Sequence, residues 1–166
     1  MTVVPEFFRP LALDRVGAGT FEHEVAATAE ECAALATRLG IPAVLALSCR
    51  FRLHRGESGR IAAMGDLRAR LVRECVVTLE EFETDVSEAF RVAFVPAGSE
   101  SEDDDPESDD EIPYTGSAID LGEAAAEQLA LTLDPYPHKP GATLPAEVRE
   151  TLESPFAALA RRRDDA

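Results

Sequence analysis

The chain has 166 residues, of which 45% are hydrophobic, and this length and composition fit one globular domain, residues 1–166, with its own core. The formal net charge of -16 argues against binding of nucleic acid, because polyphosphate repels an acidic surface. The charge is unevenly distributed, however. The run ESEDDDPESDDE at 100–111 holds nine of the 32 acidic residues, whereas residues 50–73 hold seven arginines. The net charge therefore does not exclude binding of a polyanionic ligand by residues 50–73.

Two features of the sequence indicate the compartment. The N-terminal stretch MTVVPEFFRPLALDR lacks the basic start and long apolar core of a signal peptide, and no segment approaches the length of a membrane span. Cys32, Cys49 and Cys75 are an odd number of widely spaced cysteines, which is typical of reduced thiols rather than of a disulfide framework. We therefore expect a cytoplasmic protein.

The first elements that the pattern predicts are a strand and a helix. In GTFEHEVAAT, residues 19–28, apolar and polar side chains alternate as they do in a strand. The helix that follows should begin after Thr28, whose hydroxyl forms a capping box with Glu31, and it should end at Gly40.

Residues 43–96 predict an antiparallel β-meander of at least three strands. Apolar residues alternate from Ala43 to Leu53, the turn sequence GESG follows, and a second alternating run extends from Leu67 to Leu79. A third strand, EAFRVAFVP, covers 88–96. If the first two strands pair around the turn, four arginines project from one solvent-facing side of the sheet: Arg50, Arg52, Arg68 and Arg70.

The acidic run interrupts this pattern. Residues 98–112 combine low hydrophobicity with dense like charge, so we expect a disordered acidic loop within the domain. The simpler interpretation is a solvated spacer, and the alternative is a site for a basic partner.

Beyond the loop, the sequence predicts a helix capped by Asp120, with Glu123 closing a capping box and Pro135 preventing its continuation. The segment DPYPHKPG then either docks on the sheet or presents its side chains to a partner, and docking is the simpler expectation. Two short helical pieces follow in 144–163. Together these elements define an α+β fold, with a helix before the meander and a capped helix plus short C-terminal helical pieces after the acidic loop.

The four arginines are the most informative candidate site. Guanidinium groups spread over a sheet can hold several phosphates of a folded RNA, but they can equally form a solvated face paired with acids of the same chain. No Cys or His spacing typical of zinc is present, so we expect buried thiols and no metal. No catalytic motif or phosphate-binding loop is present either, so we expect no catalytic residues, no enzyme and no cofactor.

Several segments resemble a known family. The combination of CVVTLEEF from Cys75, the variable acidic stretch, IDLGEAAAEQLALTLDPYP from Ile119 and SPFAAL from Ser154 is similar to the YceD family of large ribosomal RNA subunit accumulation proteins, in its alphaproteobacterial form. Many relatives have a second cysteine three residues after the first, where this chain has Thr78, so no metal or redox role of such a pair carries over. The resemblance implies a bacterial protein required for accumulation or processing of large-subunit ribosomal RNA, with no established catalytic residues.

Two hypotheses follow for the partner. In the first, the protein binds large-subunit precursor RNA through Arg50, Arg52, Arg68 and Arg70 while the acidic loop stays free. In the second, it is an adaptor whose acidic loop holds a basic ribosomal protein and which does not touch RNA. Neither hypothesis involves a membrane or DNA. A hydrolase acting on the RNA lacks any set of residues to perform it.

Overall fold

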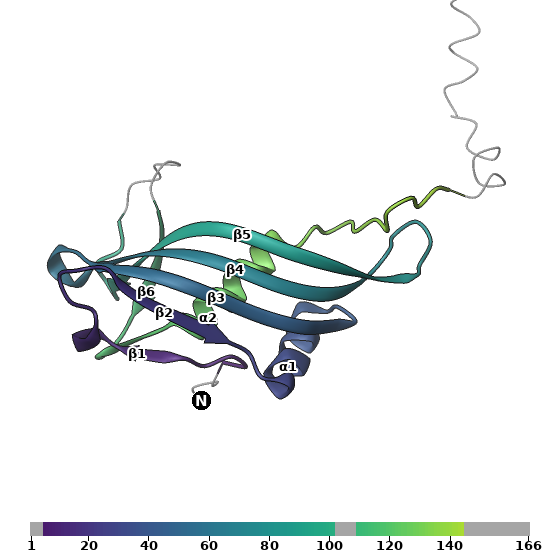
Figure 1. The fold of residues 1–166 in the computed structure, drawn as a ribbon. Helices are drawn as coiled ribbons and strands as arrows, with labels where there is room; N and C mark the ends of the chain where they lie inside the picture. Colours follow the sequence, from purple (N-terminus) through teal and green to yellow (C-terminus); the bar gives the residue numbers. More distant parts are fainter. Residues whose placement is uncertain (1–4, 102–108, 145–166) are drawn as a thin grey trace, which may run out of the picture.

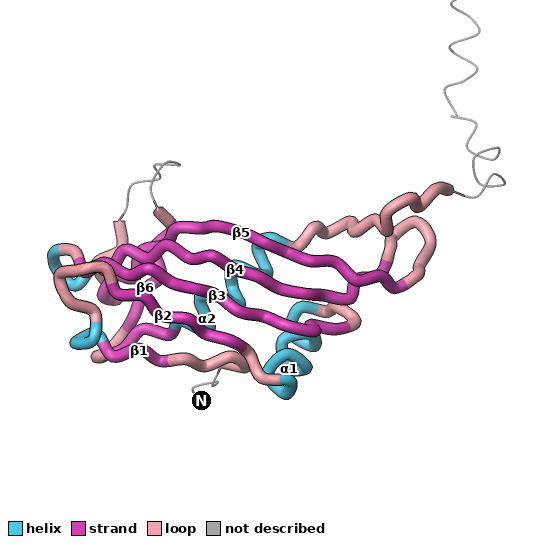
Figure 2. Tube along the Cα trace, viewed as in Figure 1, coloured by secondary structure: helices cyan, strands magenta, loops and turns pink. Residues whose placement is uncertain are grey.

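A five-stranded sheet dominates the fold (Figures 1 and 2). The computed structural model describes residues 5–101 and 109–144. The order along the sheet is β2-β3-β4-β5-β6; the first four strands are antiparallel to their neighbours, whereas β6 runs parallel to β5. The strands are β2 (Phe21–Ala26), β3 (Ala43–Arg55), β4 (Ile61–Glu74), β5 (Glu81–Pro96) and β6 (Asp110–Tyr114).

Two helices and a small second sheet complete the described fold. The helix α1 (Ala29–Leu39) connects β2 to β3, and α2 (Leu121–Thr132) lies across one side of the long sheet, visible behind the strands in Figure 1. We call that side the inner face and the opposite side the outer face. The short strands β1 (Pro10–Ala12) and β7 (Ala118–Asp120) pair antiparallel and bring the N-terminal segment beside the start of α2.

The core lies between the inner face and α2. The strands contribute alternate residues to it, so that in β4 every second side chain from Ile61 to Arg73 is buried while its neighbours face solvent. From the helices come small and medium side chains, including Leu35 of α1 and Leu121 and Leu129 of α2, none of which is exposed. Along β3 and β4 the outward-pointing side chains are exposed or partly exposed, whereas at the β6 end of β5 the outer-face residues Ala93 and Val95 are buried.

The predicted helix termini are confirmed with one exception. Thr28 and Glu31 form the reciprocal capping box, and Gly40 ends α1 with a left-handed φ of 64°. Asp120 caps α2 by accepting hydrogen bonds from the backbone N–H groups of Gly122 and Glu123. The side chain of Glu123 does not close a second box, because it is bound instead by a guanidinium of α1 (Arg38).

The α+β class and the antiparallel meander are also confirmed, but parts of the strand prediction are wrong. A β-bulge between Val44 and Ala46 adds one residue to β3, so Leu45 is exposed while Val44 is buried. The second strand ends at Glu74, and Leu79, predicted in the core, lies in the next turn with a positive φ of 59° and 71% exposure.

The acidic segment is only partly described. Residues 102–108 and the predicted C-terminal helical pieces, apart from Leu144, lie outside the described residues. The last residues of the predicted loop form a strand instead. Asp110 begins β6, which pairs with the last five residues of β5. Parallel pairing stabilises this segment through backbone hydrogen bonds. The acidic side chains give no indication of this pairing in the sequence.

Candidate nucleic-acid interface

The structure places the four predicted arginines together on the outer face. Arg50 and Arg52 come from β3, and Arg68 and Arg70 come from β4. Their positions follow from the strand period of two, because the residues between them fill the core. Across the β3–β4 pair, Arg68 lies opposite Ser48 and Arg50 lies opposite Asp66, so the arginines are offset diagonally rather than stacked against one another.

Three of these arginines form ion pairs within the chain. The shortest N–O distances are 3.2 Å from Arg50 to Glu24, 3.3 Å from Arg52 to Asp66 and 3.2 Å from Arg70 to Asp85. The six side chains of these pairs are 43 to 79% exposed. Exposed pairs of this kind contribute only about 0 to 1 kcal/mol each, so they hold the guanidinium groups weakly.

Arg68 differs from the other three, because it forms no ion pair or hydrogen bond with any residue that the structure describes. Its cross-strand neighbours are the small residues Ser48 on β3 and Ser87 on β5. These three residues line two adjoining, solvent-open hollows of about 590 and 490 Å³. The centre of the outer face therefore offers an unpaired guanidinium in a space that a phosphate group could enter.

A fifth arginine belongs to the same face. Arg91 on β5 lies opposite Met64 and contributes, with Arg52, to a further hollow of about 490 Å³. The sequence contains a signal for it, since Arg91 lies between the alternating apolar residues Phe90 and Val92 of the predicted third strand and so points to the opposite face from them.

The outer face is not uniformly basic. Acidic side chains flank the arginines on both neighbouring strands and one lies between them: Glu22, Glu24, Asp66, Glu83 and Asp85. The basic part is consequently a narrow strip along β3 and β4, bordered by acids on β2 and β5.

The remaining arginines of the 50–73 segment have structural roles. Arg73 is only 8% exposed and donates to the carbonyl of Asp134 at 2.6 Å, which holds the chain after α2 against the sheet. Arg55 donates to the carbonyl of Leu13 at 3.0 Å, and Arg60 pairs with Glu111 of β6. Only some of the arginines in this segment are therefore on a surface where a ligand can reach them.

Cys75 occupies an unusual turn at the end of β4. Its side chain is fully buried, and the polar groups around it, first the side chain of Thr78 and then the backbone of Lys139, Thr78 and Val77, lower the pKa of its thiol to about 6 against the opposing effect of burial. Burial raises the pKa of Cys49 to about 12. All three cysteines are buried and unpaired, and the described residues contain no cluster of Cys, His, Asp and Glu able to hold a metal ion.

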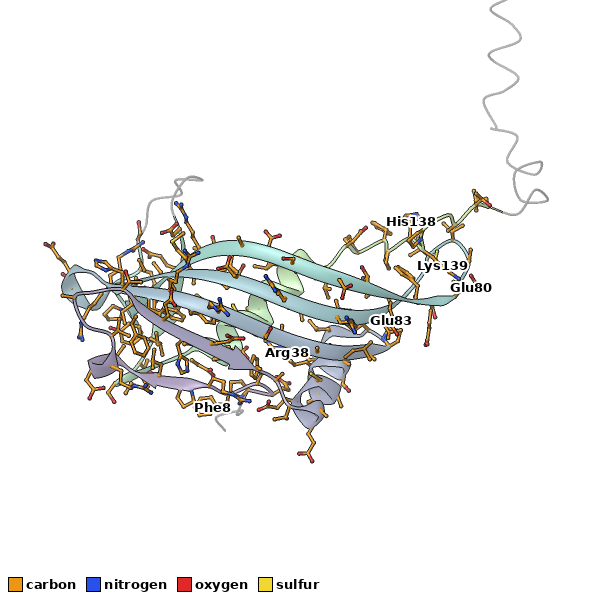
Figure 3. The ribbon with its side chains drawn as sticks, viewed as in Figure 1. Phe8, Arg38, Glu80, Glu83, His138 and Lys139 are labelled. Atoms are coloured by element: carbon orange, nitrogen blue, oxygen red, sulfur yellow. The ribbon has the colours of Figure 1, made fainter. Side chains whose placement is uncertain are left out.

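The segment after α2 docks on the same turn, as expected. The backbone N–H of Val76 donates to the carbonyl of Pro137 at 3.0 Å, and Lys139 Nζ lies 3.0 Å from Glu80. Figure 3 shows His138 and Lys139 beside this end of the β4–β5 hairpin. Tyr136 stays 68% exposed.

A comparison to known families identifies the family of the chain. Residues 63–161 match the family model described as large ribosomal RNA subunit accumulation protein YceD. The match covers more than half of the chain, which therefore belongs to the YceD family. This description supports a role in the accumulation of large-subunit ribosomal RNA. No curated protein and no solved structure matches the chain. In the described part, no helix is long and apolar enough to cross a membrane.

Proposed function

We propose that this protein is a non-enzymatic cytoplasmic factor in ribosome biogenesis that binds large-subunit precursor RNA through its outer face. The observation that carries the proposal is the guanidinium of Arg68, unpaired among the described residues, in two adjoining hollows that Arg50 of β3 and Arg70 of β4 also line. Arginine suits this task because its planar fork of donors matches phosphate oxygens.

The neighbouring ion pairs support rather than oppose this role. Arg50 and Arg70 can exchange an exposed carboxylate for a phosphate at little cost, because the pairs they leave contribute at most about 1 kcal/mol each. The acids on β2 and β5 then border the strip and repel RNA that is displaced to either side. Binding of this kind recognises the shape and charge of a folded RNA rather than its base sequence.

The test is the salt dependence of RNA affinity. Arg68→Glu removes no ion pair within the described chain, so it should leave stability within about 0.5 kcal/mol while it weakens binding of a large-subunit precursor fragment. Removal of one arginine–phosphate interaction should reduce the slope of log K against log salt by about 0.7 to 0.9. Charge reversal at Arg50, Arg52, Arg68 and Arg70 together should abolish binding.

The matched control is Arg15→Glu, which makes the same charge change on the short 3₁₀ helix Leu13–Arg15, where the guanidinium stacks 5.5 Å from the ring centre of Phe21 on the inner face. This variant should retain the slope of the original protein. Equal losses of affinity for Arg15→Glu and Arg68→Glu would show that only net charge matters, and the outer face would then not be the site.

Ultraviolet crosslinking in living cells tests whether the protein touches RNA directly. Reads clustered on large-subunit precursor RNA support the proposal. Background reads from a protein that still co-purifies with those precursors would contradict it and would favour an adaptor that holds a basic ribosomal protein. Deletion of 102–108, which leaves β6 in place, should leave RNA binding equal or tighter, since it removes like charge.

A further inference from the structure

One edge of the long sheet is open over most of its length. β5 spans Glu81–Pro96, but β6 pairs only with Val92–Pro96, so no described strand lies beyond Glu81–Arg91. β5 forms the upper edge of the sheet in Figure 1. At about 3.3 Å per residue this open edge is roughly 35 Å long, which exceeds the length of an average strand.

The pairing pattern shows which backbone groups of this edge point outward. At the β4–β5 turn the N–H of Cys75 donates to the carbonyl of Glu80 at 2.9 Å, so this pair is of the hydrogen-bonded type. Such pairs alternate with non-bonded ones along an antiparallel ladder, and the register between β4 and β5 has no shift. Even-numbered residues of β5 therefore bond to β4, and odd-numbered residues from Glu83 to Ala89 direct their N–H and C=O groups away from the sheet.

These outward groups have no partner in the described part of the chain. No backbone or side-chain hydrogen bond joins the backbone of residues 82–90 to anything other than the β4 strand among the described residues. Of the devices that protect an exposed edge, residues 81–91 contain no proline, lysine or bulge, and they contain one inward-pointing charge, Glu88 opposite Leu67. The edge is thus continuous and able to accept another strand.

The side chains of the edge differ between its two sides. Glu83 and Asp85 project on the outer face, and Asp85 is 79% exposed. On the inner face lie the partly exposed apolar side chains Phe82 and Val86. They line a hollow of about 240 Å³ between β5 and the chain after α2, together with Arg73, Thr84, Thr132, Leu133, Asp134, Pro137 and His138.

Charge decides between a second copy of the chain and a different partner. Residues 81–90 contain Glu81, Glu83, Asp85 and Glu88 and no lysine or arginine. Pairing of this edge with itself would place like charges on adjacent strands, which destabilises a sheet. A basic strand would meet the opposite charge instead.

We propose that the open edge of β5 binds an extended segment of a partner protein by β-strand addition, and that this segment alternates basic residues with apolar ones. Its backbone bonds to the odd-numbered residues Glu83 to Ala89. The basic side chains lie beside Glu83 and Asp85 on the outer face, and the apolar ones lie beside Phe82 and Val86 on the inner face. This edge adjoins the arginine strip, because Asp85 pairs with Arg70, but the inference does not depend on RNA binding.

The probe is a fluorescent eight-residue peptide of alternating lysine and valine, compared with an alternating lysine and proline peptide. The two carry the same charge, but proline fixes φ near -65°, far from the φ of about -120 to -140° of a paired strand, so the second peptide cannot form a regular ladder with the edge. The lysine–valine peptide should bind the full chain saturably and about tenfold more tightly than the lysine–proline peptide in an anisotropy titration, a ratio that corresponds to one or two net hydrogen bonds. Hydrogen exchange should slow at the amides of Glu83, Asp85, Ser87 and Ala89, while the even-numbered amides of β5 stay as they are.

A pair of double variants separates this edge from general charge attraction. Glu83→Lys with Asp85→Lys should weaken peptide binding about tenfold, since two exposed carboxylates that attract the lysines become cations that repel them. Glu22→Lys with Glu24→Lys makes the same charge change on the same face at the opposite edge, and it should leave the affinity within about twofold.

Four results would overturn the proposal. These are equal affinity for the two peptides, equal effects of the two double variants, absence of binding at millimolar peptide, and a dimer of the free protein in which the β5 amides are already protected. The last result would identify a second copy as the occupant of the edge.

Discussion

The substitution Gly122→Ala tests whether local preference or tertiary packing controls the start of α2. By helix propensity alone, alanine in place of glycine stabilises a helix by up to about 1 kcal/mol. In the structure, however, a Cβ at Gly122 would collide with the carbonyl oxygen of Phe7, and it would lie 2.8 Å from the carbonyl carbon of Phe7 and 3.0 Å from the backbone nitrogen of Arg9. These are backbone atoms, which cannot move aside as the end of a side chain can.

Relief of this collision requires the N-terminal segment to shift away from α2. The shift would strain the hydrogen bond from the N–H of Arg9 to Asp120, 2.8 Å long, and the bond from the N–H of Leu121 to the carbonyl of Arg9, 3.1 Å long. It would also loosen the packing of Phe7, which is fully buried. Overpacking at about 1 to 3 kcal/mol, plus about 1 kcal/mol for each weakened hydrogen bond, less the gain in propensity, gives a net destabilisation of about 2 to 4 kcal/mol.

The assay is urea unfolding followed by circular dichroism, with Gly19→Ala as the control. An added Cβ at Gly19 meets no atom within 4 Å, and its φ is not positive, so this variant should be neutral or stabilised by up to about 1 kcal/mol. If Gly122→Ala proved as stable as the original protein, the close approach of the N-terminal segment to α2 would be refuted.

Two further predictions concern ionisable groups. The hydrogen bond from Arg9, with help from the Thr28 cap, lowers the pKa of Glu31 from its ordinary value of 4.5 to about 2, so its contribution is complete above pH 4.5 and is lost as pH falls towards 2. Glu31→Gln should therefore cost about 1 to 3 kcal/mol at neutral pH in thermal unfolding, and a gap that persists at pH 2 would contradict the ion-pair explanation. For Cys75, thiolate absorbance should rise around pH 6 and should shift to higher pH in Thr78→Val; no rise below pH 8 in the original protein would contradict the lowered pKa of Cys75.

Much of the fold could be predicted because it depends on short-range patterns. The helix caps at Thr28 and Asp120 need only residues three or four positions apart. The four arginines were assigned to one face because side chains alternate along strands and the GESG turn joins consecutive strands of a hairpin.

The rest depended on interactions between distant residues. The bulge that exposes Leu45 has no signature in a run of apolar residues. Likewise, β6 forms because Asp110 and the residues after it meet the end of β5, although the acidic composition indicates a loop. Strand propensity predicts such segments poorly, because the backbone hydrogen bonds to a neighbouring strand stabilise them whatever their side chains are.

The amino-acid sequence by itself determined the helices, the meander, the exposure of the four arginines and the resemblance to the YceD family, since periodicity and capping act over a few residues. Only the tertiary structure decided that Arg50, Arg52 and Arg70 are paired while Arg68 has no partner among the described residues, and that β5 keeps an open edge. The physical reason is that ion pairs and strand neighbours join residues far apart in the sequence, which meet only through the register of the whole sheet, and the turns and the alternation of all its strands set that register together.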